Sequence, residues 1–141
     1  KVTLEEFDTD IKSINFHKGK SKAIKSCADI ITDKYDGQLP QTMDVLIKLP
    51  FIGRKTANVI LQEAFGITSG IVVDTHVKRL SNLFGLTLEK DPVKIERDLM
   101  ELLPKQDWRE FGLGLIYYGR TYCTALCKHT ECPLRKYVEN Y

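Results

Sequence analysis

The sequence lacks the features that mark membrane-spanning, secreted or disordered chains. Its 141 residues contain no uninterrupted apolar run near the roughly 18 residues that a membrane span needs, and its start, KVTLEEFDTD, lacks the basic-then-apolar order of a signal peptide. With 43% hydrophobic and 28% charged residues, the chain is too apolar for a disordered tail. We therefore expect one soluble domain over residues 1–141, with no membrane partner.

Cysteine is scarce and unevenly placed. Of the four cysteines, Cys27 stands alone, whereas Cys123, Cys127 and Cys132 lie close together near the C-terminus. This grouping is typical of a metal clip and not of the evenly spaced disulfide framework of a small secreted protein. It favours an intracellular location.

An excess of one charge sign is also missing, because 21 Lys and Arg face 19 Asp and Glu. The net charge of +2 therefore indicates no class of partner by itself. The placement is uneven, since residues 11–28 hold five lysines and no acid, and acids gather in 5–10 and 89–101. A lysine-rich face suits the phosphates of duplex DNA, although most charge runs are only solvated surface. The lysines are Lys12, Lys18, Lys20, Lys22 and Lys25.

Apolar residues recur at steps of three and four along most of the chain, which is the spacing of amphipathic helices. Asp74 and the pair Asp91-Pro92 are expected to begin helices, and Gly37 and Gly66 to end them. The strand-like run 71–73 is too short to form a sheet. The sequence therefore predicts an all-α fold, with helices over about 4–14, 24–35, 42–47, 57–65, 75–84, 92–102 and 107–119.

Residues 49–57 read as a helix end, a tight turn with one glycine, and a helix start. Such a hairpin exposes backbone N–H groups where the helix dipole favours an anion. Gly53 lets a phosphate approach the backbone closely, because it has no side chain. Such a segment is more often an ordinary turn between two helices than an anion-binding site, but the nearby lysines favour the anion-binding site.

The run LPFIGRKTANVILQEAFG (49–66), followed by VVDTHVKRLSN (72–82), resembles the helix-hairpin-helix DNA glycosylases, specifically the endonuclease III branch of the HhH-GPD superfamily. The similarity extends from Ile14-Asn15-Phe16 to Gly119-Arg120. It implies an all-helical protein with two lobes, core helices over about 20–105, and a segment of about 106–141 packed against the N-terminal part. It also implies a monomeric enzyme that removes oxidised pyrimidines and cleaves abasic sites in duplex DNA. Relatives carry further helices before the point matching Lys1, so the chain is expected to lack N-terminal helices.

By this resemblance Lys55 is the nucleophile and Asp74 the catalytic carboxylate. A lysine amine can attack the sugar C1′, displace the base and form a Schiff base that permits β-elimination. A carboxylate nearby can stabilise the positive charge that develops at C1′. Lys55 is then expected in a desolvated cleft. Taken alone, Lys55 is a surface lysine and Asp74 a helix cap, and capping and catalysis are compatible.

The resemblance also predicts DNA contacts in the hairpin and the basic face. Phe16 is the candidate wedge that fills the gap left by an extracted nucleotide, and its alternative is a core aromatic that anchors the loop. His76 lies beside the Asp74 motif, where capping or surface roles are equally open. The predicted DNA-binding residues are Phe16, Lys18, Lys20, Leu49, Pro50, Ile52, Gly53, Arg54, Thr56 and His76.

The cysteine tail departs from the family, whose members commonly bind a [4Fe-4S] cluster through four cysteines. Cys123 and Cys132 fit the first and third positions, but His129 and Val138 stand where the second and fourth belong, and Cys127 is displaced. A regular four-thiolate cluster is therefore not expected. Zinc ligands are present in Cys123, Cys127, His129 and Cys132, with unusually short spacing. No cofactor is assigned.

Two other functions stay open. A helix-hairpin-helix module that only grips DNA fits if the altered tail or missing helices mean that activity has been lost. The second open function is that of a related glycosylase that acts on mismatched or oxidised purines. Monofunctional mismatch and adenine glycosylases, however, typically lack the lysine. Lys55 therefore favours the glycosylase with lyase activity.

Overall fold

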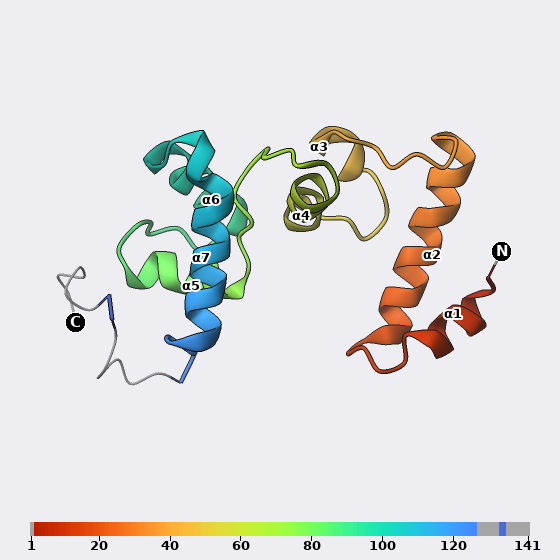
Figure 1. Cartoon of the computed structure of the whole chain (residues 1–141), viewed down its shortest axis with the longest axis horizontal. Coiled ribbons are helices and arrows are strands. Elements are labelled where there is room, and N and C mark those ends of the chain that lie inside the picture. The colour runs from red at the N-terminus through yellow and green to blue at the C-terminus, as the bar shows by residue number, and fades with distance from the viewer. Residues whose placement is uncertain (1, 127–132, 135–141) are drawn as a thin grey trace. The chain divides into compact units, whose positions relative to one another are not determined.

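The computed structural model describes residues 2–126 and 133–134, and every regular element in them is a helix (Figure 1). Residues 71–73 form neither a strand nor a helix. The all-α prediction is confirmed. No helix in this described part is long and apolar enough to cross a membrane. The elements are α1 (Leu4–Asp10), α2 (His17–Lys34), α3 (Met43–Leu46), α4 (Arg54–Phe65), α5 (Thr75–Leu83), α6 (Pro92–Leu102), the 3-10 helix η1 (Lys105–Asp107) and α7 (Trp108–Thr121).

The chain divides into two compact units, Lys1–Gly53 (unit 1) and Arg54–Tyr141 (unit 2). The single domain over residues 1–141, with its C-terminal segment packed on the N-terminal part, stays a prediction.

In unit 1, α1 packs against the start of α2 (Figure 1). Asp8 of α1 joins the two helices, because its Oδ1 accepts a hydrogen bond from the Ser21 hydroxyl at 2.8 Å and lies 2.9 Å from Nδ1 of His17. Ser21 is buried, so the shared carboxylate satisfies a polar group that water does not reach. This polar contact, together with the capping box of Thr3 and Glu6, fixes the first helix in place.

Unit 2 has a continuous apolar core to which α5, α6 and α7 each contribute. α5 packs against α7 along its buried face, and the indole of Trp108 donates to the carbonyl of Leu103 at 2.9 Å. Residues 71–73, which precede the Asp74 cap of α5, are buried as well. The core residues are Ile71, Val73, Val77, Leu80, Ile95, Leu99, Leu115 and Cys123.

Most predicted helix ends agree with the structure. Asp74 and Asp91 cap α5 and α6, and Gly37 and Gly66 take positive φ values of 74° and 66° after α2 and α4. The exceptions are the start of α2, at His17 and not near residue 24, and the end of the first helix, at Asp10 and not near residue 14. The chain must reverse there for Asp8 to contact α2, which itself begins earlier than predicted.

Candidate active site

The first turn of α4 and the start of α5 bring Lys55 and Asp74 to one pocket of about 360 Å³ in unit 2. Lys55 is the second residue of α4, and Asp74 immediately precedes α5. The structure therefore unites the two residues that the sequence predicted as the catalytic pair. The remaining lining residues are Val73, Thr75, Lys78 and Pro92.

Asp74 uses one carboxylate oxygen to hold its own position. Its Oδ1 accepts hydrogen bonds from the backbone N–H groups of His76 at 2.8 Å and Val77 at 2.9 Å. Its Oδ2 accepts none from the part of the chain that the structure describes. The same residue can therefore cap α5 and offer a negative oxygen to the pocket.

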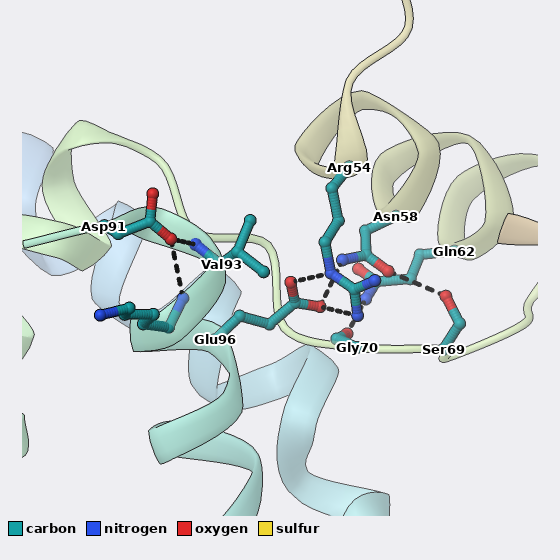
Figure 2. Close-up of polar contacts among 9 residues, drawn as sticks. Arg54, Asn58, Gln62, Ser69, Gly70, Asp91, Val93 and Glu96 are labelled. Carbon is teal, nitrogen blue, oxygen red and sulfur yellow. Dashed lines mark hydrogen bonds and ion pairs between the residues drawn. The ribbon is translucent and has the colours of Figure 1, made fainter. Parts of the chain in front are cut away.

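A buried carboxylate of α6 organises the first turn of α4 (Figure 2). The side chain of Glu96 is 4% exposed and receives Nε of Arg54 at 2.5 Å and Nη2 of Arg54 at 3.2 Å. Nδ2 of Asn58 donates to Glu96 at 2.8 Å, and Oδ1 of Asn58 accepts from Ser69 at 2.8 Å. A two-point pair between guanidinium and carboxylate is short and directional, so it holds the turn that carries Lys55.

The packing around this network is tight. A Cβ added at Gly70 would lie 2.0 Å from Oε1 of Glu96, so the backbone approaches the carboxylate as closely as only glycine allows. The Gln62 side chain donates to the Gly70 carbonyl at 2.8 Å. Sequence reasoning missed this network. Its one signal was that Asn58 and Gln62, which are polar, share a helix face with apolar Leu61.

Two expectations about this turn are changed by the structure. Lys55 is exposed, so the expected desolvated cleft around it is wrong. Arg54 directs its guanidinium to Glu96, and its predicted contact with DNA stays a prediction. Thr56 is exposed beside them.

The turn before α4 contains Gly53 and Phe51, which differ in backbone conformation. Gly53 has an unremarkable φ, and a Cβ added there would meet nothing within 4 Å. Neither packing nor backbone geometry in the protein therefore requires glycine at 53, in line with the idea that an external group approaches it. The positive φ of the turn, 62°, belongs instead to Phe51, whose side chain is 75% exposed.

Other hairpin residues hold the turn. Leu49 is buried, and its carbonyl accepts the N–H of Ile52 at 3.3 Å. The carbonyl of Pro50 accepts from the thiol of Cys27 at 3.0 Å, which ties the turn to α2 within unit 1. Their predicted DNA contacts remain untested, but Leu49 has no accessible side chain to offer.

Phe16 stands at the N-terminus of α2 with a left-handed backbone, φ 61°, and a side chain that is 88% exposed. The alternative that Phe16 is a core aromatic is therefore wrong. Lys18 and Lys20 follow on the first turn and are exposed. The role of Phe16 as a wedge in DNA stays a prediction, and the structure leaves its ring accessible for it.

His76 is half-buried against α7 in unit 2. A Cβ added at Gly119 would lie 2.7 Å from Nδ1 of His76, so the imidazole occupies the space that this glycine leaves. The ring therefore helps to seat α5 on α7. A DNA contact of His76 remains a prediction.

The predicted metal ligands lie mostly outside the described residues, as Cys127, His129 and Cys132 do, together with Val138. Cys123 is buried, and its sulfur lies 3.4 Å from Nη1 of Arg79, whose Nη2 donates to the Cys123 carbonyl. The described ranges 2–126 and 133–134 contain no group of three His, Cys, Asp or Glu suited to a metal. That the tail holds no four-thiolate [4Fe-4S] cluster stays a prediction, which rests on Val138, a residue without a donor atom, at the place of the fourth cysteine.

The model of the HhH-GPD superfamily of base excision DNA repair proteins matches residues 1–105 of the 141. The chain belongs to this superfamily. Endonuclease III of Synechocystis sp. is 48% identical over 133 residues, covering 92% of this chain and 60% of that protein. Endonuclease III of Bacillus subtilis is 44% identical over 135 residues, covering 94% and 61%. The HhH-GPD chain thus spans about 60% of the length of these curated relatives.

Solved structures agree with the sequence comparison. A non-covalent endonuclease III-DNA complex matches with a TM-score of 0.88 and 38% identity, covering 98% of this chain and 65% of the other. A trapped covalent endonuclease III-DNA intermediate matches with a TM-score of 0.86 and 39% identity, covering 94% and 63%. The predicted resemblance and the helix-hairpin-helix glycosylase fold are confirmed.

Proposed function

We propose that this HhH-GPD protein is a bifunctional DNA glycosylase and AP lyase that removes oxidised pyrimidines from duplex DNA. The observation that carries the proposal is the single pocket that Lys55 and Asp74 share. The similar structure of a trapped covalent endonuclease III-DNA intermediate adds support, since a lysine nucleophile forms such an adduct. The protein acts as a monomer on the DNA inside the cell.

Lys55 supplies the nucleophile. Its Nζ bonds to C1′ of the damaged nucleotide while the bond from C1′ to the base breaks, and the base leaves with the electron pair and takes up a proton. Loss of the amine proton and opening of the sugar ring at O4′ give an imine between Nζ and C1′. The protonated imine acidifies the C2′ proton, whose removal expels the 3′ phosphate and cuts the strand. Water then hydrolyses the imine and frees Lys55.

Asp74 acts on the charge of the first step. Positive charge grows on the sugar as the base departs, and a carboxylate already fixed nearby stabilises it without reorganisation. The hydrogen bonds to Oδ1 provide that fixed position, and Oδ2 remains for the sugar or for a proton. Asp74 is therefore expected to affect the rate much more than the fold.

DNA binding is assigned to the hairpin turn and the lysines of α2. The turn offers backbone N–H groups and an open approach at Gly53, and the exposed Lys18 and Lys20 neutralise phosphates. The exposed ring of Phe16 suits insertion into the base stack. These contacts hold the duplex while the damaged nucleotide enters the pocket of Lys55.

The decisive experiment traps the imine. Reduction of a mixture of the protein and abasic-site duplex DNA with borohydride should join them covalently, because hydride converts the imine into a stable amine. Lys55→Gln should abolish the adduct. The matched control is Lys78→Gln, tested at a protein concentration that keeps the abasic duplex bound, because Lys78 is the second amine in the same pocket and should not be needed to form the imine.

The outcomes separate the competing functions. A parent protein that binds the duplex but never traps contradicts the lyase and favours a module that only grips DNA. Trapping that survives Lys55→Gln but is lost in Lys78→Gln would assign the nucleophile to α5 instead. Lys18→Ala and Lys20→Ala control for adventitious reaction with the abasic aldehyde, and both should still trap.

The same proposal assigns no regular [4Fe-4S] cluster to the chain. Val138 and His129 replace two of the four thiolates that such a cluster needs. Metal analysis of protein purified without air is expected to find no stoichiometric cluster. A broad brown absorption band with about four irons per chain would contradict this assignment.

A further inference from the structure

A second pocket of about 480 Å³ adjoins the catalytic pocket along α5. The two pockets share Thr75 and Lys78, so they are continuous on the surface of unit 2. Three of the described lining residues are cations and none is an acid. The lining residues are Thr75, Lys78, Arg79, Asn82 and Lys90.

Helix geometry explains why these residues meet. Positions 75, 78, 79 and 82 follow the i, i+3, i+4, i+7 spacing of a single helix face. Lys90 comes from the loop after α5, and its Nζ lies 2.5 Å from Oδ1 of Asn82. Nδ2 of Asn82 in turn donates to the Glu89 carbonyl at 3.0 Å. Asn82 is therefore a positioning residue that holds Lys90 at the rim of the pocket.

Two of the three cations, Arg79 and Lys90, are held by the protein before any ligand binds. Nη1 and Nη2 of Arg79 are anchored on the sulfur and carbonyl of Cys123. Lys78 forms no ion pair with the described residues. Fixed donors bind an anion with less loss of side-chain freedom than mobile ones do.

Glu89 and Asp91, the two carboxylates next to Lys90 in the sequence, have partners outside the pocket lining. Glu89 lies 3.5 Å from Nζ of Lys94, which is outside the pocket lining. Asp91 accepts the N–H groups of Val93 and Lys94 at 3.0 and 3.1 Å as the cap of α6 (Figure 2). The positive charge of the pocket is therefore left for an external anion.

We propose that this second pocket is a phosphate subsite for the DNA strand under repair. It holds a backbone phosphate that flanks the nucleotide lying against Lys55. The proposal rests on the proposed function, because the strand in the catalytic pocket continues through the residues that both pockets share. Phosphate is the anion that a strand supplies at each nucleotide, and lysine and arginine are its usual partners.

The test measures binding to a duplex that contains a non-cleavable abasic analogue, over a range of salt concentrations. Each lost phosphate contact lowers the slope of log affinity against log salt by about 1. Lys78→Gln and Lys90→Ala should each show this decrease, with affinity about 5- to 10-fold weaker near 0.1 M salt. Lys105→Ala is the matched control, because Lys105 is an exposed lysine of unit 2 that lines neither pocket.

Neutral methylphosphonate linkages, introduced one at a time around the abasic analogue, locate the phosphate. At one position, the neutral linkage should weaken DNA binding by the parent protein. The same linkage should have little further effect on DNA binding by Lys90→Ala, because this variant has already lost the partner of that phosphate. Additive losses at every position, or salt slopes equal to that of Lys105→Ala, would overturn the subsite. Thermal unfolding of each variant checks that the fold is kept.

Free phosphate is the other source of the same chemistry. If inorganic phosphate at constant ionic strength stabilises the parent but not Lys90→Ala, and the DNA slopes are unchanged, the pocket is a free-anion site and the proposal is wrong. Borohydride trapping by the parent reports on Lys55 independently. If the salt slopes of the variants are reduced but the parent does not trap, the phosphate subsite is supported and the lyase activity is refuted. If the parent traps but the salt slopes of the variants are unchanged, the lyase activity is supported and the phosphate subsite is refuted.

Discussion

Unit 1 and unit 2 are both helical, but they bury their apolar residues to different extents. In unit 1 the periodic residues Leu4, Ile14 and Ile24 are 37, 44 and 50% exposed. In unit 2 the core residues named above are all less than 9% exposed. Amphipathic spacing therefore predicted helices in both units, but these three residues of unit 1 are not buried, whereas the core residues of unit 2 are.

This difference matches the two tasks that we assign. A reaction at one carbon atom needs the nucleophile and the carboxylate held to a fraction of an ångström, which packed elements achieve. Lys55 and Asp74 both belong to unit 2. Phosphate binding by exposed lysines tolerates more motion, because the attraction is long-ranged, and the lysine run lies in unit 1.

Backbone strain shows the same contrast. The described non-glycine residues with positive φ are Phe16, Asp36 and Phe51, and all three lie in unit 1. Such conformations cost of order 1–3 kcal/mol and tend to persist where function needs them. Phe16 and Phe51 combine this strain with exposed aromatic rings, as expected of residues that meet a partner.

The largest expected effect concerns the chemistry of unit 2. Asp74→Asn should slow single-turnover base removal by about 100- to 1000-fold, the range seen when one electrostatic contact to a transition state is lost. Thermal stability should change little, because asparagine also caps helices. Parallel cleavage and melting measurements test this. Cleavage at the parental rate would reduce Asp74 to a cap.

The next effect tests the contrast in burial directly. Leu99→Ala removes a fully buried side chain from unit 2 and should lower the free energy of unfolding by about 2–5 kcal/mol. Ile24→Ala, at a half-exposed position of unit 1, should cost about 1 kcal/mol or less. Urea titration of both variants provides the comparison. Equal losses would mean that the two units do not differ in core strength.

A smaller effect concerns acid stability in unit 1. The hydrogen bond from Ser21, followed by His17 and Lys18, holds the pKa of Asp8 below its ordinary value of 3.8. The ionised carboxylate therefore stabilises the fold above about pH 3.8, and this contribution is lost as the pH falls through the lower folded value.

Asp8→Asn should accordingly melt below the parent at pH 7, and the gap should narrow as the pH falls below 3.8. Asp10→Asn is the matched control in the same helix, because Asp10 is exposed. A melting difference that is constant from neutral to acidic pH would show that the carboxylate charge at position 8 does not contribute.

The smallest effect has the opposite sign. Phe51→Gly relieves a left-handed backbone that costs a side chain about 1–2 kcal/mol, and part of this gain is offset by the greater freedom of glycine when unfolded. We expect a stabilisation of up to about 1 kcal/mol in urea titration. A destabilised Phe51→Gly variant would mean that the ring of Phe51 makes stabilising contacts in the free protein.

Gly53→Ala should leave the stability of the protein nearly unchanged, because the added Cβ meets open space, while weakening DNA binding.

Local signals carried most of the fold prediction. Helix caps and the glycines that end helices act on residues close to them in the chain, so a single sequence is enough to predict them. Examples are Asp74, Asp91 and Gly37. The hairpin and the Lys55 and Asp74 positions were found through motif resemblance. The end of α1 was misplaced because a contact from Asp8 to Ser21, which no periodicity shows, decides where the chain turns.

The sequence by itself determined the helical class and most helix boundaries, because these depend on residues that are close in the chain, and its motif resemblance supplied the prediction that Lys55 and Asp74 form a catalytic pair. The tertiary structure alone decided that Arg54 turns to Glu96, 42 residues away, and that Lys55 remains exposed. It also decided that Lys78 and Lys90 line one pocket. Charges and buried polar groups choose their partners by distance in space, and the packing of α4, α5 and α6 sets those distances.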